Sequence, residues 1–286
     1  MVMAADTLAE AAPAKVNLYL HIRGRRADGY HLLDSLAVFP RIGDYLEAEP
    51  ASTLGLSLTG PFADTLPVSD DNLVLKAAAK LAERRGIRAG AALHLIKNLP
   101  VASGIGGGST DAAAALRLLA RLWQTEVPED LALSLGADVP VCMTPTPQFM
   151  GGIGEDLRTC PNLPEAWMVL VNPMVSVSTG AVFNALATRD NPPGPIAPID
   201  GFQSANALIS WLHAQRNDME GAARNLCPPI SDVLTALSDA PLARMSGSGA
   251  TCFALFETGP QAEHLAERLR RLNASWWIAV SPIGAP

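Results

Sequence analysis

Apolar residues alternate with polar ones in several segments of the first half of the chain, and this spacing predicts strands. The segment KVNLYLHI within residues 14–22 alternates in this way. A second strand region covers residues 35–49, where Gly43 and Asp44 suggest a turn. Residues 93–99 predict a further strand that leads into a glycine-rich segment.

A helical spacing of apolar residues appears between these strand segments. Residues 72–85 have a helical period, with Leu73 and Leu81 on one face. The glycine-rich segment is followed by alanines and leucines that predict a helix with a buried stripe ending at Trp123. A shorter helix is expected over residues 129–135.

The second half of the chain mixes the two spacings again. Residues 167–171 predict a buried strand, and residues 191–198 form a proline-rich loop that excludes helix and central strand. Near the C-terminus a β–α–β pattern is expected, with strands at 252–256 and 276–281 and a helix at 261–272. The mixture of elements indicates an α+β or α/β fold.

The character of the chain changes near residues 155–163, after a second glycine turn. A chain of 286 residues is long enough for one large domain or two ordinary ones. We therefore expect two domains, residues 1–158 and residues 159–286.

Composition and charge narrow the class of protein. The chain is 49% hydrophobic and 17% charged, which is typical of a globular protein, and its formal net charge is −7. Nucleic-acid binding requires a basic surface, so this charge argues against it, whereas a small anionic ligand remains possible. No apolar run approaches the roughly 20 residues of a membrane span. The first dozen residues lack the basic start of a secretory signal.

The cysteines add an expectation about the compartment. Cys142, Cys160, Cys227 and Cys252 are scattered without metal-binding or disulfide-rich spacing. We expect buried thiols in a reducing compartment, and hence a cytoplasmic protein without membrane association.

The glycine-rich segment PVASGIGGGSTDAA carries the clearest chemical signal. Its glycines allow backbone amides to approach an anion, and a helix N-terminus adds unpaired amides and a positive dipole end. These features predict a phosphate-binding loop. The alternative is an ordinary turn capped by Ser109 or Asp111. A Walker A loop is a poor match because no lysine follows the glycines. A dinucleotide fingerprint is also a poor match, because Ser109 occupies its third glycine position.

Four other places could carry chemistry, although each has a simpler interpretation. Lys15 could be a solvated charge at a strand edge, and Asp138 could cap a turn. Tyr30 and His31 could face a flat ligand or pack within their turn. The segment MSGSGA, residues 245–250, could be a hairpin connection or a wall facing a ligand.

Taken together and in order, PAKVNLYLHIRGRRADGYH, PVASGIGGGSTDAA, GADVPV and MSGSGATCFALF resemble the motifs of the GHMP kinase superfamily. This superfamily includes galactokinase, homoserine kinase and mevalonate kinase. The resemblance covers about residues 13–257. The first motif is similar to that of the branch whose alcohol substrate carries a cytidine diphosphate group, in the non-mevalonate isoprenoid pathway.

The resemblance implies a two-domain GHMP kinase fold of the α+β class. Its N-terminal domain is similar to the second domain of ribosomal protein S5, and its C-terminal domain is ferredoxin-like. ATP is the implied co-substrate, and Mg²⁺ is expected near the hydroxyl of Ser109 or Thr110. The residues implied to surround the ATP phosphates are Pro100, Val101, Ala102, Ser103, Gly104, Ile105, Gly106, Gly107, Gly108, Ser109 and Thr110.

The resemblance also implies roles in catalysis. Asp138 would be the general base that takes the proton from the substrate hydroxyl. Lys15 would lie beside Asp138, keep it ionised and neutralise charge on the transferred group. Asn17 would hold the substrate near this pair.

The same resemblance implies how the substrate is recognised. Tyr30 and Phe183 would sandwich the cytosine ring, and His31 would hydrogen-bond its edge. Ser246, Gly247, Ser248 and Gly249 would close over the substrate side. The expected partner is this small molecule alone, bound by a monomer or a homodimer.

Three rival functions remain open from the sequence. Another GHMP kinase would act on a different alcohol and need no cytidine group. A non-catalytic nucleotide sensor is disfavoured because the chain keeps both Lys15 and Asp138. A Rossmann oxidoreductase is disfavoured by Ser109 and by the lack of a clear series of parallel strands.

Overall fold

The computed structural model describes residues 7–66, 69 and 71–284, which form two compact units. The first unit comprises the described residues of Met1–Ala14, Gly43–Val101 and Gly106–Thr144. The second comprises those of Lys15–Ile42, Ala102–Ile105 and Pro145–Pro286. Each unit is therefore assembled from segments that are far apart in the sequence.

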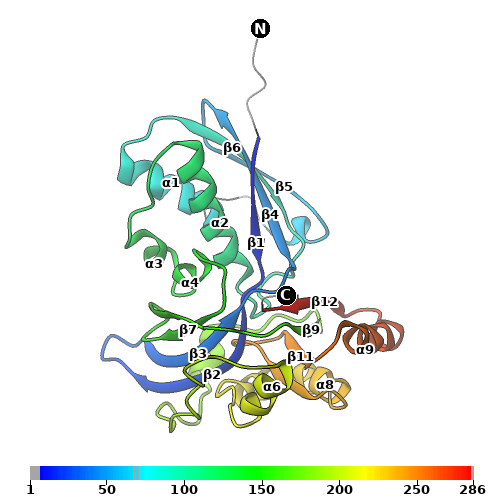
Figure 1. Ribbon diagram of the computed structural model, residues 1–286. Coiled ribbons are helices and arrows are strands. Elements are labelled where there is room, and N and C mark those ends of the chain that lie inside the picture. The colour runs from blue at the N-terminus through cyan, green and yellow to red at the C-terminus, as the bar shows by residue number, and fades with distance from the viewer. Residues whose placement is uncertain (1–6, 67–68, 70, 285–286) are drawn as a thin grey trace. The chain divides into compact units, whose positions relative to one another are not determined.

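The first unit is a four-stranded sheet with helices packed on it (Figure 1). The strand order is β1-β4-β6-β5, antiparallel except for the parallel pair β5 and β6. Helix α2 packs on β1 and β4, and α1 packs beside α2. The elements are β1 (Leu8–Pro13), β4 (Gly43–Ala51), β5 (Gly55–Thr59), a 3-10 turn (Ala63–Thr65), α1 (Leu73–Arg85), β6 (Gly90–Ile96), α2 (Gly107–Leu122), α3 (Leu131–Leu135) and α4 (Val139–Cys142).

Helix α1 shows why the local sequence specifies its ends. The side chain of Asn72 accepts a hydrogen bond from the Val74 amide, and Gly86 ends the helix in the left-handed conformation at φ 64°. The helix predicted over residues 72–85 is confirmed. Its buried face is centred on Ala77 and Leu81.

The predicted turn at Gly43 and Asp44 is wrong, because these two residues begin strand β4. A Cβ atom on Gly43 would overlap the backbone of Ala12 and Pro13, so the glycine permits close approach of β1. The Asp44 carboxylate accepts hydrogen bonds from the Asn98 and Leu99 amides instead of closing a turn. The predicted strand region 35–49 is thus divided between two sheets.

The second unit holds two four-stranded sheets. One has the order β2-β3-β7-β8 and the other the order β10-β11-β9-β12, both antiparallel throughout. The strands are β2 (Val16–Arg25), β3 (His31–Val38), β7 (Gln148–Gly151), β8 (Asp156–Thr159), β9 (Ala166–Asn172), β10 (Leu242–Met245), β11 (Cys252–Phe256) and β12 (Trp277–Ile283). The helices are α5 (Thr179–Asn184), α6 (Ala205–His213), α7 (Glu220–Leu226), α8 (Pro229–Ala236) and α9 (Gly259–Leu272).

The predicted C-terminal β–α–β pattern is confirmed as β11, α9 and β12. Strand β9 lies between β11 and β12, so the pattern is a split β–α–β unit. With β10 at the edge, the four strands have the order of a ferredoxin-like sheet. The proline-rich residues 191–198 contain neither helix nor strand, as expected.

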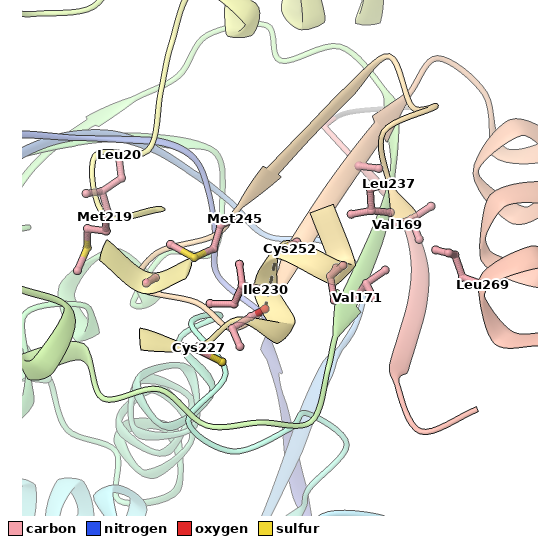
Figure 2. Packing of buried hydrophobic residues seen from close by; sticks show 14 of the residues in the cluster. Leu20, Val169, Val171, Met219, Cys227, Ile230, Leu237, Met245, Cys252 and Leu269 are labelled. Carbon is pink, nitrogen blue, oxygen red and sulfur yellow. Dashed lines mark hydrogen bonds between the residues drawn. The ribbon is translucent and has the colours of Figure 1, made fainter. Parts of the chain in front are cut away.

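A buried apolar cluster joins this sheet to its helices (Figure 2). Val169 and Val171 of β9 pack with Ile230 of α8 and Leu269 of α9. Strand β2 contributes Leu20, which belongs to the same cluster. The core of the second unit thus includes residues from both ends of the chain.

The compact units do not coincide with consecutive domains that meet at residue 158. Residues 15–42 group with the C-terminal segments because β2 pairs with β3, β3 pairs with β7, and β7 pairs with β8. The division into residues 1–158 and 159–286 stays a prediction. Within the part of the chain that the structure describes, none of the helices has the length and apolar character needed to cross a membrane.

Candidate active site

Lys15 and Asn17 stand at the start of strand β2, in the second unit. Lys15 is only 4% exposed, and its amide donates a hydrogen bond to the Ile105 carbonyl at 2.9 Å. The interpretation of Lys15 as a solvated strand-edge charge is therefore wrong. The Nδ2 group of Asn17 donates to the Ser35 hydroxyl at 2.7 Å, while its buried Oδ1 has no partner among the described residues.

The serine–glycine turn, residues 246–249, connects β10 to β11 and contacts both Asn17 and the glycine-rich segment. The Ser246 hydroxyl accepts a hydrogen bond from the Asn17 amide at 3.1 Å and donates to the Gly104 carbonyl at 3.1 Å. The hydroxyls of Ser248 and Thr179 are 2.8 Å apart. The segment is a hairpin connection, and it also lies against other candidate residues.

The middle of the glycine-rich segment has a backbone that only glycine tolerates. Gly104 has φ 74°, and a Cβ atom there would overlap the carbonyl of Gly249. The Ser103 carbonyl accepts a hydrogen bond from the Thr251 amide at 3.0 Å. Lys15, Asn17, Gly104 and the serine–glycine turn are thus brought together in one unit.

The end of the same segment forms the N-terminus of helix α2, in the first unit. The helix begins at Gly107, and its N-cap residue is Gly106, at φ 67°. Among the described residues the amides of Gly107, Gly108 and Ser109 have no hydrogen-bond acceptor, whereas the Thr110 amide donates to the Gly106 carbonyl. This arrangement suits an anion such as a phosphate group.

The alternative of a turn capped by Ser109 or Asp111 is wrong. The N-cap residue is a glycine without a side chain, and the Asp111 carboxylate binds Lys97 instead of a helix amide. The Thr110 hydroxyl is buried and donates to the Gly107 carbonyl at 2.9 Å. Ser109 is half-buried and has no such bond, so its hydroxyl fits a magnesium ion better than that of Thr110.

A buried charge cluster of Asp44, Lys97 and Asp111 lies behind this helix end, and the pattern of the sequence does not indicate it. The Lys97 ammonium group binds Asp111 at 2.7 Å and also contacts Asp44. Burial raises the pKa of Asp111 to about 8, although Lys97 opposes the shift. The three residues meet because β4 pairs with β6, where Tyr45 lies opposite Ile96. No sequence motif signals that pairing.

Asp138 belongs to the first unit and occupies the N-cap position of the short helix α4. Its side chain makes no capping hydrogen bond and is half-buried. The Asp138 side chain therefore does not cap helix α4. Its pairing with Lys15 stays a prediction.

The residues predicted to recognise cytosine lie on α5 and around the start of β3. The His31 and Phe183 rings stack with centroids 4.5 Å apart and an interplanar angle of 13°. Tyr30 follows a turn in the chain, and its residue is 55% exposed. Burial lowers the pKa of His31, and the positive charges of Arg25 and Arg189 lower it further. Phe183 thus packs on His31, whereas the prediction places it on the base.

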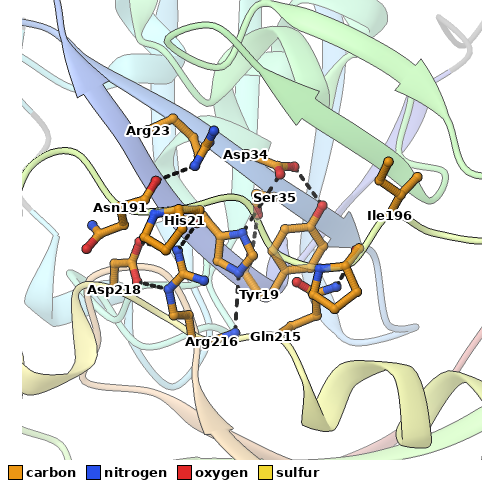
Figure 3. Close-up of polar contacts among 12 residues, drawn as sticks. Tyr19, His21, Arg23, Asp34, Ser35, Asn191, Ile196, Gln215, Arg216 and Asp218 are labelled. Atoms are coloured by element: carbon orange, nitrogen blue, oxygen red, sulfur yellow. Dashed lines mark hydrogen bonds and ion pairs between the residues drawn. The ribbon is translucent and has the colours of Figure 1, made fainter.

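A polar network surrounds the middle of β2 in the second unit (Figure 3). The Tyr19 hydroxyl donates to Asp34 at 2.7 Å, and the buried His21 ring accepts from the Arg216 amide at 3.4 Å. Arg23 donates to the Asn191 carbonyl. The proline-rich loop is bonded to this network, because Gln215 donates to the Pro195 carbonyl at 2.7 Å.

The cysteines and acidic residues add no metal centre to this picture. The four cysteines are buried, as expected, and none forms a disulfide within the part of the chain that the structure describes. Among residues 7–66, 69 and 71–284, no three or more histidine, cysteine, aspartate or glutamate side chains gather in a metal-binding group.

Comparison with known protein families finds a match in each half of the chain. Residues 72–148 match the GHMP kinases N terminal domain, and residues 200–274 match the GHMP kinases C terminal domain. A 4-diphosphocytidyl-2-C-methyl-D-erythritol kinase from Cereibacter sphaeroides is 54% identical over 273 residues, which cover 94% of this chain and 96% of that protein.

Solved structures agree with the family match. The crystal structure of a 4-(cytidine 5'-diphospho)-2C-methyl-D-erythritol kinase superposes with a TM-score of 0.79 at 33% identity, covering 98% of this chain and all of the other. A homoserine kinase from Cytophaga hutchinsonii has a TM-score of 0.67 at 19% identity, covering 99% and 97% of the two chains, and shares the fold.

Proposed function

Because the chain belongs to the 4-diphosphocytidyl-2-C-methyl-D-erythritol kinases of the GHMP kinase family, we propose that it phosphorylates the 2-hydroxyl group of 4-diphosphocytidyl-2-C-methyl-D-erythritol with ATP. The chain is a kinase with the two-domain GHMP fold. The observation that carries the proposal is the N-terminus of α2, where three successive amides lack acceptors among the described residues.

In this proposal, residues 100–110 bind the phosphates of ATP. The amides of Gly107, Gly108 and Ser109 would donate to phosphate oxygens, and the dipole of α2 would favour their negative charge. A bound magnesium ion would neutralise charge on the phosphates, and the Ser109 hydroxyl is the group we propose to hold it. The glycines at 104 and 106 give the loop its path, since both have positive φ angles.

We further propose that transfer occurs in one step, without a phosphorylated enzyme. The Asp138 carboxylate would accept the proton of the 2-hydroxyl group as its oxygen attacks the γ-phosphorus atom. The bond between the γ-phosphorus and the bridging oxygen would break, and ADP would leave. Lys15 would stabilise the charge on the transferred group, because phosphoryl transfer depends mainly on positioning and electrostatics.

Recognition of the cytidine group is assigned to the stacked rings at the start of β3. His31 has a buried Nε2 atom without a partner among the described residues, which suits a hydrogen bond to the edge of a base. The neighbouring Tyr30 offers an exposed aromatic face, and Phe183 stacks on the imidazole ring of His31. Asn17 and residues 246–249 would contact the rest of the substrate.

The cellular setting follows from the same proposal. We propose a cytoplasmic enzyme, monomeric or homodimeric, that acts on a small molecule without nucleic acid or membrane. The formal net charge of −7 supports the exclusion of nucleic acid.

The proposal is tested by ADP release in a coupled assay with magnesium and four alcohols. We expect release with 4-diphosphocytidyl-2-C-methyl-D-erythritol and none with mevalonate, homoserine or galactose. Release with another alcohol alone would keep the kinase chemistry and overturn the substrate. ATP binding without release from any alcohol would instead favour a nucleotide sensor.

A further inference from the structure

Asn217 is a buried residue whose side chain holds the serine–glycine turn from behind. Its Nδ2 group donates two hydrogen bonds, to the Met245 carbonyl at 2.8 Å and to the Gly247 carbonyl at 2.9 Å. Its Oδ1 atom accepts from the Met219 amide at 2.9 Å. Asn217 is 8% exposed, so these bonds form away from solvent.

The backbone around Asn217 is fixed to strand β2. The Leu20 amide donates to the Arg216 carbonyl at 3.0 Å, and the Asp218 amide donates to the Leu20 carbonyl at 2.8 Å. The Asp218 carboxylate also accepts from the Ile22 amide at 2.7 Å. Asn217 therefore links the strand that begins beside Lys15 to the serine–glycine turn.

The orientation of one peptide group follows from these bonds. In a trans peptide the carbonyl and the next amide point in opposite directions. Since the Gly247 carbonyl points to Asn217, the Ser248 amide points away from it. This amide has no acceptor among the described residues, and neither does the Gly247 amide.

We infer that Asn217 is a positioning residue that aims the Ser248 amide at a phosphate oxygen of the cytidine diphosphate substrate. The inference rests on the proposed function, which assigns residues 246–249 to the substrate side. Gly247 has φ 53°, and turns with such a left-handed residue can present successive amides to an anion. Asn217 itself does not touch the substrate.

The first test replaces the two N–H donors without changing the size of the side chain. In Asn217→Asp a carboxylate oxygen faces the carbonyls of Met245 and Gly247, so the peptide group between Gly247 and Ser248 loses its anchor. We expect the KM for the cytidylyl substrate to rise about tenfold or more while the KM for ATP changes little.

Asn172 offers a matched control in the same unit. It is also buried, and its Oδ1 atom accepts from the Met174 amide two residues on, as that of Asn217 does from Met219. Its Nδ2 group donates to the Thr251 hydroxyl at 2.8 Å, which can turn and donate to a carboxylate. We expect Asn172→Asp to leave both KM values unchanged. A rise in KM for both variants, or for neither, would overturn the inference.

A second measurement uses the unmodified protein and needs no turnover. In a ¹⁵N NMR titration with the cytidylyl substrate alone, we expect the Ser248 amide resonance to move strongly. If the substrate binds and this resonance stays in place, the inference fails while the proposed function stands. If the substrate does not bind at all, the proposed function fails.

Discussion

Two buried lysines illustrate how the same residue type serves different purposes. Lys97 lies between Asp44 and Asp111 in the first unit, so its charge is matched within the fold. Lys15 directly precedes strand β2, and its amide is fixed by the Ile105 carbonyl of the glycine-rich segment. Lys97 pairs with Asp111 near the start of helix α2 and so holds the helix end of the proposed phosphate site, whereas Lys15 is proposed to stabilise charge on the transferred phosphoryl group.

Replacing the proposed base tests the assignment of Asp138. Asp138→Asn keeps the shape of the side chain but cannot accept the hydroxyl proton, so we expect kcat to fall by a factor of about 100 or more. Its affinity for ATP, measured by calorimetry, should stay close to that of the unmodified protein.

Asp130 provides the control for this experiment. It also occupies the N-cap position of a short helix without capping it, and it pairs with Arg84 at the surface. We expect Asp130→Asn to keep nearly full activity. An Asp138→Asn enzyme that is equally active would remove Asp138 from the mechanism.

Truncation of Tyr30 tests the proposed cytosine site. The side chain is 55% exposed and makes no ring contact with another described residue, so Tyr30→Ala should hardly change thermal stability. We expect the KM for the cytidylyl substrate to rise far more than the KM for ATP, because stacking on the base is lost. Tyr45, which is 51% exposed on β4, is the matched control, and Tyr45→Ala should leave both constants unchanged. A Tyr30→Ala effect on ATP alone would place this ring elsewhere.

The buried charge cluster predicts a dependence of stability on pH. Burial raises the pKa of Asp111 to about 8, so the folded protein holds this proton where the unfolded chain has lost it. The free energy of unfolding should therefore fall as pH rises from about 4 to 8, because the unfolded chain releases this proton and the folded protein keeps it. In Asp111→Asn this contribution disappears, and urea unfolding across the range should show a flatter slope. An unchanged slope would show that Asp111 is ionised throughout.

At the scale of elements, the glycine-rich segment combines a backbone requirement with a chemical one. Gly104→Ala would place a methyl group against the Gly249 carbonyl at a φ angle of 74°. We expect a loss of more than about 1 kcal/mol in unfolding free energy, together with weaker ATP binding. Both are measured by thermal unfolding with and without ATP.

Gly221 in α7 supplies the comparison. A Cβ atom there would meet nothing within 4 Å. We therefore expect Gly221→Ala to raise the free energy of unfolding by roughly 0.5–1 kcal/mol and to leave ATP binding unchanged. If Gly104→Ala behaved in the same way, the segment would not need its glycine at this position.

The sequence predicts an element well where the spacing of its apolar residues and the residues at its ends point to the same structure. Helix α1 has Asn72 at its start and Gly86 at its end, and strand β11 spans the expected residues 252–256. The predicted turn at Gly43 is wrong because glycine is common in turns, whereas this glycine allows β4 to pack closely against β1. That role depends on a neighbour about 30 residues earlier, which periodicity does not show.

The candidate site was predictable where residues adjacent in the chain act together. The glycine-rich segment and the pair Tyr30 and His31 are of this kind. Asn217 and Lys97 were missed, because their partners come from pairing of distant segments. Lys15 and Asp138 were each ambiguous alone, and only the order of motifs along the chain pointed to them.

At the scale of the whole molecule, the second unit depends on strand β2. Leu20 and Ile22 of β2 belong to the same buried cluster as Val169 and Val171 of β9. Burial of two such side chains contributes roughly 3–6 kcal/mol, a large part of the stability of a domain.

A fragment of residues 159–286 should therefore not fold alone, although the family model for the C-terminal domain lies within it. We expect an NMR spectrum with little dispersion and no cooperative unfolding transition, in contrast to the full chain. Cooperative unfolding of the isolated fragment would show that β2 is dispensable for this core.

The central claim concerns one chemical event, the transfer of a phosphoryl group from ATP to the 2-hydroxyl group of the cytidylyl substrate. The most direct test is ³¹P NMR of the purified protein with ATP, magnesium and 4-diphosphocytidyl-2-C-methyl-D-erythritol. We predict a new phosphomonoester resonance that grows as ATP becomes ADP, while the diphosphate resonances of the substrate remain. Loss of ATP without a phosphomonoester, or cleavage of the cytidine diphosphate group, would contradict the account.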